Sequence, residues 1–321
     1  MAEKVYKSYR QQISILRSRG MIIGKGSQGS RVMRVLEREN YYNVINGYKD
    51  LFLDHNQTNQ SEDQYKTGTT FDEVYALYSF DRELRSIYLR FLLKIENSVK
   101  TVISHEFSAV YGHDNYLKVS NFNSSCNDDI SASIKLIGDI QQEIARQMSK
   151  HHQVVTHYMT EHGYMPLWVL VNVLTFGKIE NFYKCMKPAD RTKVSVQFGV
   201  QPDELGKFMH MLGLARNKCA HDERFFDIRF RSSIHTKSIK NFSKLGLPRQ
   251  KGGSYIYGTN DAFAIAIIFA LLLSKSDLKE FITLMKNAFG KLQKQLHTIP
   301  AKEVMEKMGF GQSWTNLSLI G

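Results

Sequence analysis

The sequence is poor in cysteine and proline, has no long apolar run and carries fewer acids than bases. Its three cysteines (Cys126, Cys185 and Cys219) show no CxxC spacing, which excludes a disulfide framework and is typical of a reduced, cytoplasmic protein. The longest apolar run, 262–273, has twelve residues, too few to cross the ~30 Å hydrocarbon core of a membrane. The first residues lack the apolar segment of a secretory signal. We therefore expect a cytoplasmic protein without a membrane partner.

The shortage of acids leaves a strongly basic chain. Lysine and arginine number 43 against 31 aspartates and glutamates, a formal net charge of +12 over 321 residues. Apolar residues make up 42%, enough to build a core and so to exclude a disordered or collagen-like chain. The charge excess predicts a polyanionic partner, and nucleic acid is the leading class.

The spacing of apolar residues predicts an all-α fold. These residues recur at three- and four-residue steps through most of the chain, and no long segment alternates with the two-residue period of a strand. The clearest stripe predicts a helix over about 71–107, Pro202 opens another helix, and 262–273 predicts a fully buried one. We expect a loop at 24–30 and one helical stretch at 165–186. The predicted organisation is an N-terminal helical extension over 1–60 and a helical domain over 61–321.

One part of the helical domain differs in character. Residues 231–256 contain no acid, and their glycines and proline predict a basic loop or short hairpin inserted between helices. A nucleic-acid contact and a plain solvated loop both fit this pattern. The predicted RNA-binding residues in and near it are Arg224, Arg231, Lys237, Lys240, Lys244, Arg249 and Lys251.

Two further patterns resemble ligand sites, but their surroundings argue against both. Residues 24–29 match GxGxxG, yet an amphipathic helix precedes them instead of a buried strand, so we predict an interhelical loop. A short segment holds four histidines, none of them four residues from another, and no cysteine or acid cluster joins them. Surface histidines are therefore favoured over a zinc site for His151, His152, His157 and His162. We expect no metal and no cofactor.

The long helix is predicted to carry two ion pairs. Asp81 and Arg85 are four residues apart, as are Glu96 and Lys100, and side chains at this spacing share a helix face. A charged side chain near the apolar stripe requires a partner, which each pair provides. Structural ion pairs are the first interpretation, and support of a functional site by Asp81, Arg85 and Glu96 is the alternative.

The segment 216–221 has the strongest catalytic potential. The apolar stripe of its helix predicts that Arg216, Asn217 and His221 lie off the core side. Asn217 and His221 are four residues apart and share a face. Arg216 and His221 are five apart, so on a straight helix they point about 140° from each other. A break in the helix, or a second copy of the chain, would bring them to one phosphate.

The residue types of this segment fit metal-free RNA cleavage. A neutral imidazole accepts a proton near pH 7, and an imidazolium returns it to a leaving oxygen. A guanidinium recognises phosphate and holds developing negative charge, while a side-chain amide orients either group. Together they suit cleavage of RNA by its own 2′-hydroxyl.

The blocks around these residues resemble the Abi family of phage-defence proteins, the AbiD- and AbiF-like proteins whose core is a HEPN domain. The hexapeptide RNKCAH at 216–221, with Arg224–Phe226 just beyond, looks like the family signature. Other blocks agree in order along nearly the whole chain: 16–20 with 40–42 and 47–48, 81–85 with 95–96, 166–168 with 176–177, and 308–310 with Trp314.

The resemblance implies an HEPN-like helical bundle, often a homodimer, in which the RxxxxH motifs of two copies meet in one cleft. Family members resemble metal-independent endoribonucleases of abortive infection or toxin systems, which leave 2′,3′-cyclic phosphate ends. Arg216 would then stabilise the scissile phosphate, His221 would transfer protons and Asn217 would support both. The alternative is a non-cleaving module that holds a structured noncoding RNA or regulates an effector. Asp222 and Glu223 depart from the family pattern, and acids there would repel phosphate.

Overall fold

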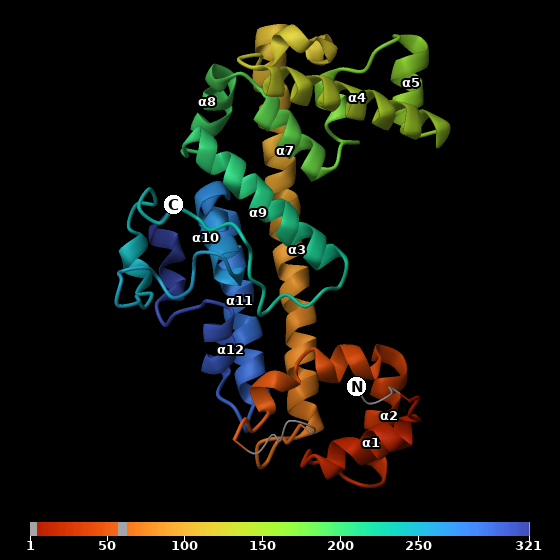
Figure 1. Cartoon of the computed structure of the whole chain (residues 1–321), viewed down its shortest axis with the longest axis vertical. Helices are drawn as coiled ribbons and strands as arrows, with labels where there is room; N and C mark the ends of the chain where they lie inside the picture. The colour runs from red at the N-terminus through yellow and green to blue at the C-terminus, as the bar shows by residue number, and fades with distance from the viewer. Residues whose placement is uncertain (1–4, 57–62, 321) are drawn as a thin grey trace.

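The computed structural model describes residues 5–56 and 63–320, which form an all-α protein around one long helix. α3 (Phe71–Tyr111) has 41 residues, about 60 Å at 1.5 Å per residue, and runs most of the length of the molecule (Figure 1). The predicted fold class is confirmed, because the described residues contain isolated bridges but no strand. The predicted helix over 71–107 is this helix.

α3 begins at a capping box whose carboxylate also binds a segment near the C-terminus of the chain. The Thr70 hydroxyl accepts from the Glu73 N–H (3.3 Å), and the Glu73 carboxylate accepts from the Thr70 N–H (3.1 Å). The same buried carboxylate accepts from the N–H groups of His297 (2.7 Å) and Thr298 (2.6 Å), just beyond α11 (Lys275–Gln295). Burial alone would raise the pKa of Glu73, but these donors lower it overall. The carboxylate therefore joins the start of α3 to the end of α11.

α11 packs antiparallel along the N-terminal half of α3. Phe80 meets Phe289 with ring centroids 5.6 Å apart, and Lys94 pairs with Asp277 near the other end of α11. α10 (Ala262–Leu272) packs against both α3 and α11. It is buried at every position except one, so the predicted buried helix is confirmed. Within the described residues, no helix combines the length and apolar character needed to cross a membrane.

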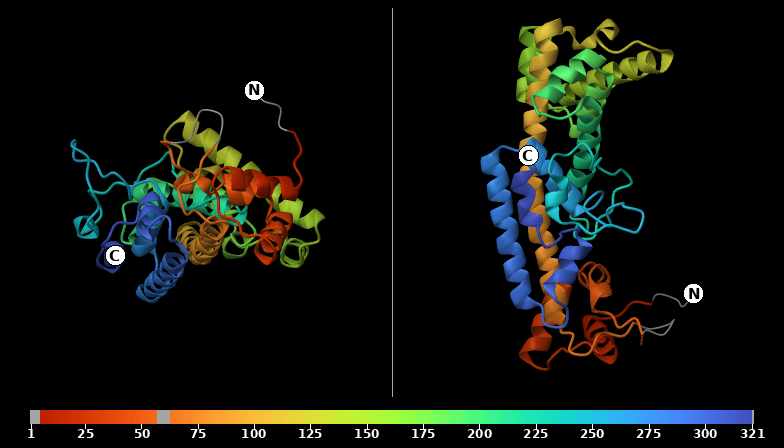
Figure 2. Two further views of the ribbon diagram at one scale, coloured as in Figure 1. Left: turned by 90° about the horizontal axis from the view of Figure 1, so that it is seen from below. Right: turned by 90° about the vertical axis from the view of Figure 1, so that its left-hand side faces the viewer.

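The remaining helices gather at the two ends of α3 and across its middle. Figures 1 and 2 show the N-terminal helices at the start of α3, another group of helices around its end, and α9 (Pro202–Ala220) crossing between them. The N-terminal helices are α1 (Tyr9–Ser18) and α2 (Ser27–Glu39). The group at the other end is α4 (Asn127–Ser149), α5 (Gln153–Glu161), α6 (Leu167–Leu170), α7 (Phe176–Cys185) and α8 (Pro188–Val196). A short α12 (Ala301–Lys307) follows α11.

Two predicted boundaries are wrong. The loop predicted at 24–30 is confined to 24–26, because Gly26 adopts a φ of 68° and α2 begins at Ser27. The stretch predicted as one helix at 165–186 is divided into α6 and α7, since the Thr175 hydroxyl caps α7 by accepting from the Lys178 N–H (3.4 Å). Of the predicted extension over 1–60, residues 1–4 and 57–60 lie outside the described part of the chain.

The basic segment 231–256 is an ordered excursion between α9 and α10. It contains a short 3-10 helix, η5 (Phe242–Leu245), and an antiparallel bridge between Arg249 and Tyr255. Gly253, with a φ of 83°, forms the turn of this small hairpin by donating its N–H to Gln250 (2.9 Å). The cations of the segment are exposed. Five buried apolar side chains fix the segment to the protein: Ile234, Ile239, Phe242, Leu245 and Leu247.

Candidate functional site

The hexapeptide 216–221 forms the last turns of α9. This helix continues unbroken from Pro202 to Ala220, and His221 caps it. Asn217 and His221 are exposed, whereas the Arg216 side chain is 38% exposed. A break in the helix between Arg216 and His221 is therefore excluded. Within one copy of the chain the two side chains leave α9 about 140° apart.

Arg216 is directed toward α3 by Glu96. Its Nε lies 3.7 Å from Glu96 Oε2, while Glu96 Oε1 accepts from the Lys100 ammonium at 2.9 Å, so the predicted Glu96–Lys100 pair is confirmed. Both Arg216 Nε and Glu96 Oε2 are buried without a hydrogen bond, so only their ion pair compensates them. The terminal nitrogens of Arg216 form no hydrogen bond within the described chain. Arg216 is thus held at its Nε and keeps an open fork for an anion.

After His221 the chain leaves α9 through a left-handed turn. Asp222 has a φ of +56°, a conformation that favours glycine, and the Glu223 N–H donates to the Lys218 carbonyl (3.2 Å) as in a Schellman motif. The Asp222 carboxylate pairs with Arg85 of α3. This ion pair stabilises a backbone conformation that is costly for aspartate.

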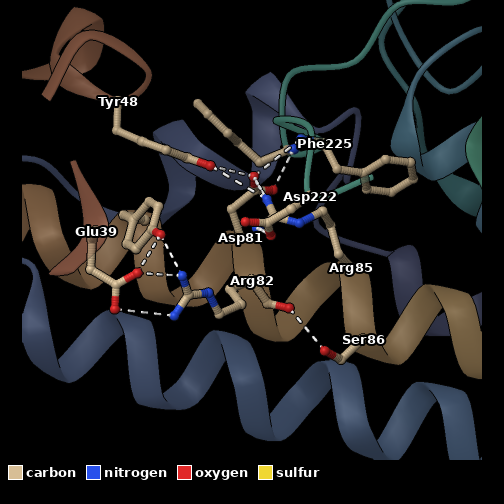
Figure 3. A network of polar contacts seen from close by, with 10 residues as sticks. Glu39, Tyr48, Asp81, Arg82, Arg85, Ser86, Asp222 and Phe225 are labelled. Atoms are coloured by element: carbon tan, nitrogen blue, oxygen red, sulfur yellow. Dashed lines mark hydrogen bonds and ion pairs between the residues drawn. The ribbon is translucent and has the colours of Figure 1, made fainter. Parts of the chain in front are cut away.

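Asp81 holds the next residues of the same turn. Its buried carboxylate accepts from Arg85 (2.6 Å), from the Tyr48 hydroxyl (2.6 Å) and from the backbone N–H groups of Phe225 (3.1 Å) and Phe226 (2.7 Å). Figure 3 shows Tyr48, Arg85 and Phe225 converging on Asp81, and Arg85 also pairs with Asp222. Burial raises the pKa of Asp81, and Arg85 and the other donors oppose that change. The predicted Asp81–Arg85 pair is confirmed, and it anchors the segment that follows His221.

Two aromatic side chains complete this anchor. Phe225 is fully buried with its ring centroid 4.9 Å from that of Tyr88, and Phe226 stacks on Tyr48 at 5.6 Å. Burial of two such rings contributes on the order of 4 kcal/mol in total. The end of α9 is therefore fixed to α3 by an apolar contact as well as by charge. The sequence did not assign Tyr48 or Tyr88 to the site, because neither residue is near the motif along the chain.

The acids next to His221 each have a cationic partner. Asp222 pairs with Arg85, and Glu223 pairs with Lys218, which lowers the pKa of Glu223. Asp227 pairs with Arg224 at 2.9 Å. Arg85 also pairs with Asp81, so its single charge is shared, and the negative charge expected to repel phosphate is compensated only in part. Arg224 also donates to the Gly47 carbonyl (2.6 Å), so this predicted RNA-binding residue is already engaged within the fold.

The other predicted RNA-binding residues have no acidic partner within the described residues. They are all exposed and lie in the basic segment, and none forms an ion pair with a described residue: Arg231, Lys237, Lys240, Lys244, Arg249 and Lys251. An acid-free set of uncompensated cations creates a positive potential on this side of α9.

The patterns that resembled ligand sites lie apart from this network. Residues 24–26 join α1 to α2, where the Arg17 guanidinium donates to the carbonyls of Ile23 (3.0 Å) and Gly24 (2.9 Å). The rings of His157 and His162 are 5.8 Å apart, and the described residues contain no group of three or more histidine, cysteine or acid side chains that could hold a metal ion. Burial raises the pKa of Cys219 to about 12, so this thiol on α9 is a core residue and not a nucleophile.

Comparison with known proteins assigns the family. The family model described as Abi-like protein matches residues 34–227, more than half of the 321-residue chain. The chain belongs to the Abi-like protein family. The matched region begins in α2, includes all of α3 and α9 and ends at Asp227, so it contains both the RxxxxH segment and its anchor on α3. Membership suggests abortive infection, a form of phage defence. No curated protein and no solved structure matches the chain significantly.

Proposed function

We propose that this Abi-like protein is a metal-independent endoribonuclease of abortive infection, with an HEPN-type site formed by Arg216, Asn217 and His221. The observation that carries the proposal is the exposed end of α9, where an imidazole and an amide share one face and a guanidinium keeps an open fork. The acids of the surrounding turn each have a cationic partner, although Asp222 shares Arg85 with Asp81, so their repulsion of a phosphate is reduced.

The chemistry requires only groups of the chain and of the RNA. One neutral His221 imidazole takes the proton of a 2′-hydroxyl, and the 2′-oxygen forms a bond to the adjacent phosphorus. The bond from phosphorus to the 5′-oxygen breaks, and a second, protonated imidazole gives its proton to that oxygen. Arg216 stabilises the extra negative charge on the phosphorus oxygens, and Asn217 orients the groups. The products are a 2′,3′-cyclic phosphate and a 5′-hydroxyl.

A second copy of the chain supplies the second imidazole. α9 carries an exposed stripe of residues spaced alternately three and four apart, which is the spacing of a helix–helix seam: Lys207, His210, Leu214, Asn217 and His221. Leu214, at its centre, is 41% exposed although it is apolar. Pairing two such helices in parallel, about a two-fold axis that runs along the seam, would bring two RxxxxH segments together, which the straight helix prevents within one copy.

The test is cleavage of RNA by the wild-type protein and by His221→Ala in the presence of EDTA. Loss of a proton-transfer group should slow cleavage by about 10²–10⁴-fold. His162→Ala removes an exposed histidine elsewhere and is the matched control. Product ends are identified by their 2′,3′-cyclic phosphates. Equal cleavage by wild type and His221→Ala would refute the role of His221.

A second candidate function is a non-cleaving module that holds a structured noncoding RNA. The six unpaired cations of the basic segment favour it, because they bind phosphate whether or not His221 reacts. RNA that copurifies with both wild type and His221→Ala, without turnover by either, would support this function over the nuclease.

A further inference from the structure

The basic segment encloses a hollow that no part of the proposed cleavage mechanism uses. It has a volume of about 750 Å³ and lies between residues 233–243 and the hairpin at 249–255. Small-molecule and nucleotide sites commonly occupy about 300–1,000 Å³. The hollow is therefore large enough for one nucleotide.

The charge of the hollow is of one sign. Lys237 and Arg249 line it, no acid does, and neither cation forms an ion pair with any described residue. A second hollow of about 620 Å³ beside α9 differs, because both signs line it and its Arg191 pairs with Asp203 at 3.5 Å. The hollow of the basic segment thus presents two uncompensated cations to an anion.

Arg249 is held in a fixed orientation at the wall of the hollow. Its guanidinium lies 4.5 Å from the centroid of the Tyr255 ring, and its Nη2 donates to the Tyr255 hydroxyl at 2.6 Å. Tyr255 is itself supported by Phe242, edge to face at 4.8 Å. A guanidinium fixed through one nitrogen keeps its other N–H groups for phosphate, and the planar Arg–Tyr pair offers a surface on which a base can stack.

The remaining polar lining consists of the Asn241 amide and of hydroxyl groups. Five of these hydroxyl groups form no hydrogen bond with any described residue: Ser233, Thr236, Ser243, Ser254 and Thr259. Each hydroxyl can donate and accept, as recognition of ribose hydroxyls and base edges requires. Apolar floor residues, Ile239 and Phe242, complete a surface with phosphate, sugar and base partners.

We propose that this hollow binds one nucleoside-phosphate unit, with the phosphate on Lys237 and Arg249 and the base against the Arg249–Tyr255 pair. The inference rests on the proposed function in that the unit belongs to an RNA strand engaged by the same protein. The same chemistry is present in a free nucleotide, and the experiment separates these two sources.

Binding is measured with the full chain carrying His221→Ala, so that cleavage does not interfere. One arm uses a short, fluorescently labelled single-stranded RNA, and the other uses adenosine or uridine 5′-monophosphate in a calorimeter. Lys237→Ala and Arg249→Ala should each weaken binding about tenfold, as expected for loss of one charge-assisted contact. Lys240→Ala and Lys251→Ala remove the same charge from the same segment outside the hollow. As general phosphate contacts they should weaken RNA binding less than the hollow variants do, and they should leave binding of the mononucleotide unchanged.

Two further measurements test the geometry. Arg249→Lys keeps the charge but not the planar fork, so it should bind almost as weakly as Arg249→Ala while melting at the wild-type temperature. RNA carrying 5-iodouridine should cross-link to the 249–255 hairpin. Binding of the free nucleotide alone, with the same dependence on Arg249, would assign the hollow to a free nucleotide.

The outcomes separate the two proposals. If all four alanine variants weaken RNA binding equally, the segment acts as a diffuse cationic surface, and the hollow proposal is overturned while RNA binding stands. If the lysine and arginine variants of the hollow leave both arms unchanged, the hollow proposal also falls. Failure of wild type to bind or cleave any RNA would overturn the proposed function itself.

Discussion

Replacing Asp81 by asparagine tests whether the buried carboxylate holds the end of α9. Asp81 accepts four hydrogen bonds, from Arg85, the Tyr48 hydroxyl and the N–H groups of Phe225 and Phe226. In Asp81→Asn the amide oxygen accepts at most two of these hydrogen bonds. The amide NH₂ group is itself a donor and would face the remaining donors. Arg85 meanwhile loses its buried counter-ion.

The magnitude follows from these losses. Two hydrogen bonds lost at about 1–3 kcal/mol each amount to about 2–6 kcal/mol. Removal of one partner from a buried ion pair typically costs about 3–5 kcal/mol, in agreement. We therefore expect Asp81→Asn to lower the free energy of unfolding by about 3–5 kcal/mol and the melting temperature by about 6–15 °C.

The matched control is Asp72→Asn, on the same helix. The Asp72 side chain is 48% exposed and pairs with Arg31, an interaction worth about 0–1 kcal/mol. Urea titration gives both free energies, and amide hydrogen exchange reports the anchor directly, since the N–H groups of Phe225 and Phe226 should lose protection only in Asp81→Asn. Stability within 1 kcal/mol of the control, or unchanged protection of these two amides, would refute the reasoning.

Two further predictions concern acid stability and self-association. The Glu39 carboxylate accepts from Arg82 (2.6 Å), which lowers its pKa to about 2 from an ordinary 4.5. This stabilisation is complete above pH 4.5 and is lost as the pH falls toward 2. Glu39→Gln should therefore reduce the free energy of unfolding by about 1–2 kcal/mol at pH 7 and by progressively less below pH 4.5. An equal loss in urea titrations at pH 7 and pH 3 would contradict this prediction. Leu214→Arg should halve the mass of the protein found by light scattering and should also reduce RNA cleavage. The control, Leu93→Arg, changes another exposed leucine and should alter neither the mass nor the cleavage. A wild-type monomer that cleaves RNA would contradict the proposal that a second copy completes the site.

The sequence predicted those elements whose signal is local. α3, α9 and α10 follow from the spacing or density of apolar residues, and the Asp81–Arg85 pair follows from a separation of four residues on one helix. The start of α2 was placed too late, because a glycine-rich start to a helix has the same composition as a loop.

The anchor of the candidate site could not be predicted in the same way. Tyr48 reaches Asp81 from 33 residues before it, and the Phe225 N–H reaches it from 144 residues after it. Backbone N–H groups carry no sequence signature, since every residue except proline has one. The compensation of Asp222 by Arg85, 137 residues away, is likewise a product of tertiary packing, which is why sequence alone indicated repulsion of phosphate.

α3 also fixes a distance. Asp81 holds the turn after His221 and Glu96 holds Arg216, and the separation of fifteen positions between these two residues corresponds to about 22 Å of helix. Inserting or deleting one residue within 86–95 would rotate one carboxylate about 100° around the axis relative to the other, so that either the guanidinium or the turn would lose its counterpart. The side chains of residues 86–95 can vary as far as packing permits, but the number of residues in this interval cannot change. The length of α3 between these carboxylates thus sets the spacing between the Arg216 guanidinium and the turn after His221.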